Sequence, residues 1–183
     1  MEIGTVSNMV RNVDFQSVRL CEKGIACAGA GHTAQTVNPS QYFHEYRIAL
    51  EVFEQLSATW GACSVDAFAS EATALLPRFW AEADGSAAEA VDAFAQPWAS
   101  EALVWAHPPP ALLPQLVQLL EASPSASAIV CVPHWPGSQW FRPLAELSSE
   151  MLLFPPGSLQ RVAFDAPPML AQWGVAAFRV LPR

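Results

Sequence analysis

The spacing of hydrophobic residues predicts a long amphipathic helix early in the chain. Apolar residues recur every three, four or seven positions over 39–60, which is typical of one buried helix face. Asn38 is a favourable N-cap, Pro39 suits the first helical position, and Gly61 ends the segment. We expect the following residues to face the core: Phe43, Tyr46, Leu50, Phe53 and Trp60.

Further along, short apolar runs bounded by turn residues predict the strands of a sheet. They lie at 62–69, 103–106, 128–132, 151–154, 161–164 and 175–181. The run Ala128–Val132 is apolar throughout, as in the central strand of a parallel sheet. Between the strands, we expect helices at 71–80, 111–121 and 138–148, with 81–100 mostly loop.

Proline positions and the order of these elements refine the prediction. Pro77 should interrupt the helix at 71–80, and Pro114 should lie in the first turn of its helix or kink it. Helices alternate with strands, and the last strands follow one another directly. This order predicts an α/β fold with a mainly parallel sheet, flanking helices and antiparallel strands at the C-terminal end.

The first 37 residues lack this periodicity. They include a run of small residues over 24–31, which favours a flexible backbone. We therefore divide the chain into an extended N-terminal arm, 1–37, ordered against a partner, and one α/β domain, 38–183.

Charge narrows the choice of partners. Only 14% of the 183 residues are charged, against about 25% in ordinary soluble domains. The net charge is −8 and Lys23 is the only lysine, which argues against direct nucleic-acid binding. A surface so poor in charge favours burial among the protein subunits of a larger complex. The alternative is a compact, alanine-rich domain that stands alone.

The cysteines and the hydropathy pattern bear on location. None of the four cysteines (Cys21, Cys27, Cys63 and Cys131) forms a C-x-x-C pair, so we expect reduced thiols in a reducing intracellular compartment. No apolar run reaches the ~18 residues of a transmembrane helix. The N-terminus lacks the order of a secretory signal, while an organellar transit peptide stays open.

Several motifs occur in a fixed order between about 43 and 157. They are Val52-Phe53, Trp60-Gly61, Ser64-Val65-Asp66-Ala67-Phe68-Ala69-Ser70, Leu76-Pro77-Arg78-Phe79, Glu89-Ala90-Val91-Asp92-Ala93-Phe94, Trp98, His107-Pro108-Pro109, Val132-Pro133-His134-Trp135-Pro136 and Trp140-Phe141-Arg142-Pro143-Leu144. This set resembles the region that follows ribonuclease H in polyproteins of DIRS-type retroelements, itself similar to phage-type DNA adenine methyltransferases. The resemblance implies a Rossmann-like methyltransferase-type fold. It also implies that Asp66, Ala67 and Phe68 would line an S-adenosylmethionine site.

The resemblance also implies a base-binding turn, which is altered in this chain. His107, Pro108, Pro109 and Pro110 stand where such enzymes carry Asn-Pro-Pro-Tyr, which grips and stacks on a flipped adenine. Pro110 lacks the stacking ring, worth about 1–3 kcal/mol, and His107 places its acceptor nitrogen differently from an amide. The cofactor turn also lacks its usual glycines. We therefore expect a vestigial motif with no catalytic residue.

Other candidate sites have simpler alternatives, which we favour. His107 and His134 follow strand ends and could bind a metal with Asp66, or they could lie in ordinary polar turns. Asp66 and Asp92 could form a carboxylate pair, or each could cap a turn. An aromatic ligand wall or ordinary core packing could explain four tryptophans: Trp98, Trp105, Trp135 and Trp140.

These observations lead to one functional hypothesis and two alternatives. The first is a non-catalytic structural or accessory subunit of a larger assembly, derived from a methyltransferase-like retroelement domain and using no cofactor. The second is an active DNA adenine methyltransferase that uses S-adenosylmethionine. The third is a retroelement accessory domain that assists a polymerase or recombinase.

Overall fold

The computed structural model describes residues 46–82, 87–163, 166–170 and 174–183. The expected arm over 1–37, the N-cap Asn38 and the first seven positions of the expected helix at 39–60 lie outside the described residues, as do Cys21 and Cys27.

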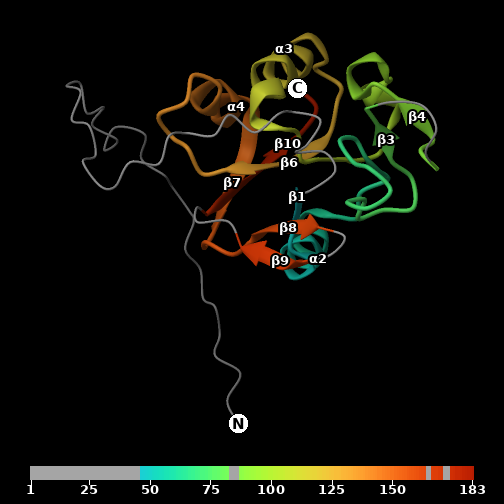
Figure 1. The fold of residues 1–183 in the computed structure, drawn as a ribbon. Coiled ribbons are helices and arrows are strands. Elements are labelled where there is room, and N and C mark those ends of the chain that lie inside the picture. The colour runs from blue at the N-terminus through green and yellow to red at the C-terminus, as the bar shows by residue number, and fades with distance from the viewer. Residues whose placement is uncertain (1–45, 83–86, 164–165, 171–173) are drawn as a thin grey trace. The chain divides into compact units, whose positions relative to one another are not determined.

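A five-stranded sheet in the order β2-β5-β6-β10-β7 forms the centre of the domain. Figure 1 shows three of its neighbouring strands, β6, β10 and β7. Its strands are β2 (Val65–Asp66), β5 (Val104–Ala106), β6 (Ala128–Pro133), β7 (Ser148–Phe154) and β10 (Val175–Val180). β2, β5 and β6 are parallel neighbours, whereas β10 runs antiparallel to both β6 and β7. The expected α/β class and the antiparallel C-terminal strands are therefore confirmed.

Two short strands extend the parallel half. β3 (Trp80–Ala81) and β4 (Ala90–Val91) pair in parallel, and a parallel bridge joins Phe79 to Asp66. β3 therefore lies beside β2, on the side away from β5.

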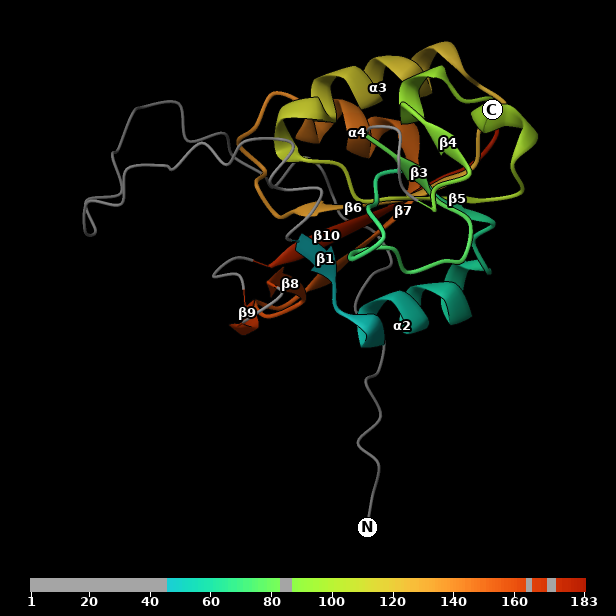
Figure 2. The same ribbon diagram turned by 45° about the vertical axis from the view of Figure 1, so that its right-hand side comes forward.

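A separate three-stranded antiparallel sheet has the order β1-β8-β9. It consists of β1 (Tyr46–Ile48), β8 (Leu159–Ala163) and β9 (Ala166–Leu170). Figure 2 shows β8 and β9 on the same side of the five-stranded sheet as helix α2 (Leu50–Trp60), and helices α3 (Leu113–Ala122) and α4 (Phe141–Leu147) on the other side.

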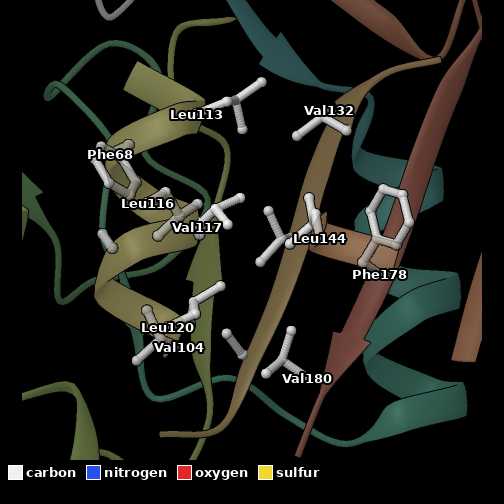
Figure 3. Packing of buried hydrophobic residues seen from close by; sticks show 14 of the residues in the cluster. Phe68, Val104, Leu113, Leu116, Val117, Leu120, Val132, Leu144, Phe178 and Val180 are labelled. Carbon is white, nitrogen blue, oxygen red and sulfur yellow. The ribbon is translucent and has the colours of Figure 1, made fainter. Parts of the chain in front are cut away.

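Alternating strand residues supply two cores, one on each face of the central sheet. On β6, for example, Val130 packs toward α3 and α4, whereas its neighbour Cys131 packs toward α2. α3 directs Leu113, Leu116, Val117 and Leu120 at the sheet, the spacing of one helix face, toward residues such as Val132 and Phe178 (Figure 3).

The prediction of one helix over 39–60 is wrong at Tyr46–Ala49, because Tyr46–Ile48 form β1 and the helix begins at Leu50. Its buried residues are Val52, Leu56 and Trp60, whereas Leu50 is 49% exposed. β1 pairs with β8, more than 100 positions further along, and such pairing leaves no local periodicity. The stop at Gly61 is confirmed, with a left-handed φ of 110°.

The helix predicted at 71–80 is absent; the segment forms turns and then joins β3. Thr73 Oγ1 accepts a hydrogen bond from the N–H of Ser70 at 2.9 Å, which favours a turn over a helix here. The expected loop at 81–100 contains β4 and the 3-10 helices η1 (Ala93–Ala95) and η2 (Trp98–Ser100).

The C-terminal part of the domain follows the prediction more closely. α3 and α4 match the helices expected at 111–121 and 138–148, and Pro114 lies in the first turn of α3. Within the described part of the chain, no helix has the length and hydropathy needed to cross a lipid bilayer.

Candidate functional site

The carboxyl ends of β2 and β5 bring the two most informative polar residues to one edge of the sheet. Asp66 is the last residue of β2 and pairs in register with Trp105, two positions before His107. From β2 the chain continues to β3 on one side, and it later returns as β5 on the other. Such a switch point at the carboxyl ends of parallel strands is where α/β sheets usually bind ligands.

A small pocket opens at this edge. The ends of β2 and β5 form part of its wall, and β1 and the 73–75 loop form the rest. The lining residues are Tyr46, Arg47, Ile48, Asp66, Phe68, Thr73, Leu75, Trp105 and His107. The free space between these residues has room for about one water molecule, so a nucleotide-sized cofactor does not fit between them as they stand.

Asp66 is almost fully buried, with 2% of its surface exposed. Its Oδ2 accepts a hydrogen bond from the N–H of Leu75 at 3.1 Å, whereas its Oδ1 is buried and has no hydrogen-bond partner among the described residues. Burial raises the pKa of Asp66 to about 7, although the backbone N–H groups of Leu75 and Phe68 oppose the rise. Near neutral pH this carboxyl group therefore exists in both protonation states.

His107 is also buried, and its ring is fixed by the neighbouring strand. Nδ1 lies 2.8 Å from the backbone oxygen of Cys131 on β6. A carbonyl oxygen only accepts hydrogen bonds, so Nδ1 carries the proton. Burial lowers the pKa of His107 to about 4, against the opposing effect of this hydrogen bond, so the imidazole is neutral at pH 7.

The rest of the expected base-binding turn is packed into the domain. Pro108 and Pro109 are buried, and Pro110 begins the 3-10 helix η3 (Pro110–Leu112) that leads into α3. The sequence alone shows that position 110 carries no aromatic ring. The structure shows in addition that positions 107–109 are buried.

The residues expected at a cofactor site divide between pocket and core. Ala67 is fully buried, and Phe68 lines the pocket but packs mainly in the core. The ring of Phe68 lies 5.4 Å from Phe94 and 6.1 Å from Trp98, centroid to centroid. The loop after β2 is thus filled by side chains where a glycine-rich turn would let a cofactor approach the backbone.

The alternative sites suggested by the sequence do not assemble. His134 does not line the pocket; the centroid of its ring lies 5.7 Å from that of Phe141, with the two rings tilted by 50°. Among the residues the structure describes, no three His, Cys, Asp or Glu side chains form a metal-binding group. Asp92 is exposed, and its Oδ1 accepts from the N–H of Phe94 at 3.0 Å, so it caps η1 as expected.

The tryptophans do not form one aromatic wall. Trp98 and Trp140 belong to the core on the α3 face of the sheet, with Trp135 packed against it. Trp105 belongs to the core on the α2 face. The burial of Trp98, Trp105 and Trp140 agrees with the expectation of ordinary core packing, whereas Trp135 is only half-buried.

Cys63 and Cys131 are free thiols. Burial raises the pKa of Cys63 to about 12 and that of Cys131 well above its usual value. Neither thiol is therefore activated as a nucleophile.

Sequence reasoning missed two features of this region. Arg47 lines the pocket from β1, a strand that the helical periodicity concealed. Arg78 binds two carboxylates, at 2.6 Å from Glu89 and 2.9 Å from Glu101. Arg78 and Glu89 lie in two successive motifs of the ordered set, and this was the only sign in the sequence that they form an ion pair.

Chemically, the edge offers a carboxyl group that can exchange a proton near neutral pH and a neutral, immobilised imidazole. It offers no exposed acceptor from Pro108 or Pro109, because both residues are buried.

Comparison with known proteins gives no match, either to a protein-family model or to a curated protein sequence.

Proposed function

We propose that this chain is a non-catalytic structural or accessory subunit of a larger protein assembly, built on a degenerate methyltransferase-like domain. One observation carries the proposal: the turn that would grip a base is part of the core. His107 is 5% exposed and hydrogen-bonded to Cys131, and the two prolines after it are buried. A flipped base needs acceptors that face an open pocket.

The strand order supports the methyltransferase-like ancestry. The central sheet combines the parallel neighbours β2, β5 and β6 with an antiparallel strand near the C-terminal end, β10, which agrees with the fold that the resemblance implies. The position of Asp66 at the end of β2 also agrees with the resemblance.

The charge distribution supports protein partners over nucleic acid. The net charge is −8, and tight DNA binding depends on several lysine or arginine contacts to phosphates. Three of the arginines in the described domain, Arg78, Arg142 and Arg179, are already paired with carboxylates. An accessory subunit with protein neighbours needs neither a basic surface nor a cofactor.

A methyl-transfer assay with a restored motif tests the proposal. The purified full chain and the double variant His107→Asn/Pro110→Tyr are incubated with methyl-labelled S-adenosylmethionine and unmethylated duplex DNA. We expect no label on DNA from either protein, because the restored side chains still lie in a buried turn. Time-dependent labelling of adenine by the wild-type chain would overturn the proposal.

A retained methyltransferase activity is the second candidate. The convergence of Asp66 and His107 on one pocket at the switch point of the sheet favours it. It requires the pocket to enlarge considerably before S-adenosylmethionine could enter.

A further inference from the structure

Strand β1 belongs to a different sheet from β2 and β5. Its residues Tyr46, Arg47 and Ile48 line the same pocket as Asp66 and His107. Among the described strands, β1 pairs only with β8, through registers such as Ile48 with Leu159. No ladder of backbone hydrogen bonds therefore ties β1 to β2 or β5.

The attachment of β1 comes from apolar packing and from β8. Ile48 is fully buried in the same core cluster as Trp105 and Leu159. The N–H of Ala49 donates to the backbone oxygen of Ser158 at 2.9 Å. Loss of the Ile48 side chain would thus weaken the attachment of β1 to the domain.

Two buried polar atoms near β1 lack hydrogen-bond partners among the described residues. Arg47 on β1 and Asp66 at the end of β2 line the same pocket. Arg47 Nε and Asp66 Oδ1 are both buried, and neither atom has a hydrogen-bond partner in the described part of the chain. Buried donors and acceptors are normally paired, because leaving them unpaired is costly. The contact is therefore less stable than an apolar interface of the same size.

We propose that β1 is an internal plug that closes the ligand crevice at the carboxyl ends of β2 and β5. Its apolar residue Ile48 holds it in place, and the unpaired polar atoms of Arg47 and Asp66 favour its release. Release would expose Asp66, Trp105 and His107 to solvent. The plug does not depend on the proposed accessory function, because a closed crevice is compatible with either candidate function.

Chemical labelling of histidine tests the plug in the full chain. Diethyl pyrocarbonate modifies accessible imidazoles, and mass spectrometry resolves His107 from the partly exposed His134, which serves as an internal reference. We expect His134 to react in the wild type and His107 to be protected. Ile48→Ala should raise the rate at His107 several-fold while leaving His134 unchanged.

Two further variants keep the test decisive. Leu120→Ala removes an equally buried side chain from the opposite core, so it should not accelerate labelling of His107. Arg47→Met removes the unpaired Nε but keeps an apolar stem, so it should slow labelling of His107 even if Ile48→Ala fails to fold. Equal acceleration by Ile48→Ala and Leu120→Ala, or faster labelling in Arg47→Met, would overturn the proposal.

Discussion

The Nδ1 atom of His107 lies 2.8 Å from the backbone oxygen of Cys131, across the gap between β5 and β6. The two strands pair in register one residue earlier, at Ala106 and Val130. The imidazole therefore continues the strand pairing by one more hydrogen bond. The His107 side chain thus acts as part of the sheet.

Replacing His107 by asparagine should destabilise the domain. An asparagine amide is shorter than imidazole and does not reach the Cys131 oxygen in the same geometry, so a buried acceptor loses its donor. We expect a loss of about 1–3 kcal/mol in the free energy of unfolding, measured by urea denaturation. Unchanged stability, or a gain of methyl transfer, would contradict the structural role of His107.

Asp66 should make the domain less stable as the pH rises. Its pKa is about 7 in the folded state, against a usual value of 3.8. The folded state therefore holds a proton that the unfolded state has released between about pH 4 and 7. The stability is fully present below pH 4 and is lost toward pH 7, at up to about 1.4 kcal/mol per pH unit. Asp66→Asn should remove this loss, as urea unfolding at several pH values would show.

His107 should have the opposite pH dependence. Its pKa is about 4 in the folded state, against a usual value of 6.5. Its contribution is present above pH 6.5 and is lost as the pH falls toward 4. Between pH 4 and 6.5 the two effects oppose each other in the wild type. Stability should rise with pH in Asp66→Asn and fall with pH in His107→Asn; identical profiles for all three proteins would refute the assignment.

Phe68 should behave as a core residue. Its ring is 4% exposed and contacts Phe94 and Trp98. Phe68→Ala should cost about 3–5 kcal/mol of unfolding free energy, whereas Phe68→Leu keeps most of the volume and should cost much less. Calorimetric melting of both variants measures the difference. A stable, well-folded Phe68→Ala protein would show that the ring is dispensable for packing.

Arg78 should stabilise the start of the parallel strands through its planar guanidinium. It bonds Glu89, Glu101 and the Ser64 backbone oxygen, which lysine cannot do in the same geometry. We expect Arg78→Lys and Arg78→Ala to lower the melting temperature similarly, and added salt to reduce the difference from wild type. Arg142→Ala, which breaks the exposed pair with Glu146, should have a smaller effect. Full stability in Arg78→Lys would show that charge alone suffices.

The elements predicted well from the sequence are those whose signal is local. The apolar run of β6 and the Pro114-containing start of α3 carry their own evidence. β1, in contrast, consists of three residues held by β8, and its residues also fit a helical stripe. The prediction of a helix at 71–80 was wrong for a similar reason, because the bridge between Phe79 and Asp66 is a long-range contact that leaves no local pattern.

The location of the candidate site was predicted only in part. The sequence suggested that His107, His134 and Asp66 could meet at one edge of the sheet; Asp66 and His107 do line one pocket, whereas His134 does not. The burial of Asp66 and His107 was not visible in the sequence, because it depends on β1 and on the loop at 73–75. The same is true of the bond to Cys131, which joins residues 24 positions apart.

The most direct test of the central claim is a calorimetric titration of the purified full chain with S-adenosylmethionine. A crevice closed around Asp66 and His107 predicts no saturable heat of binding, and the same flat trace for Asp66→Ala. A one-to-one isotherm in the wild type that disappears in Asp66→Ala would contradict this claim, because the pocket at Asp66 and His107 would then bind the cofactor.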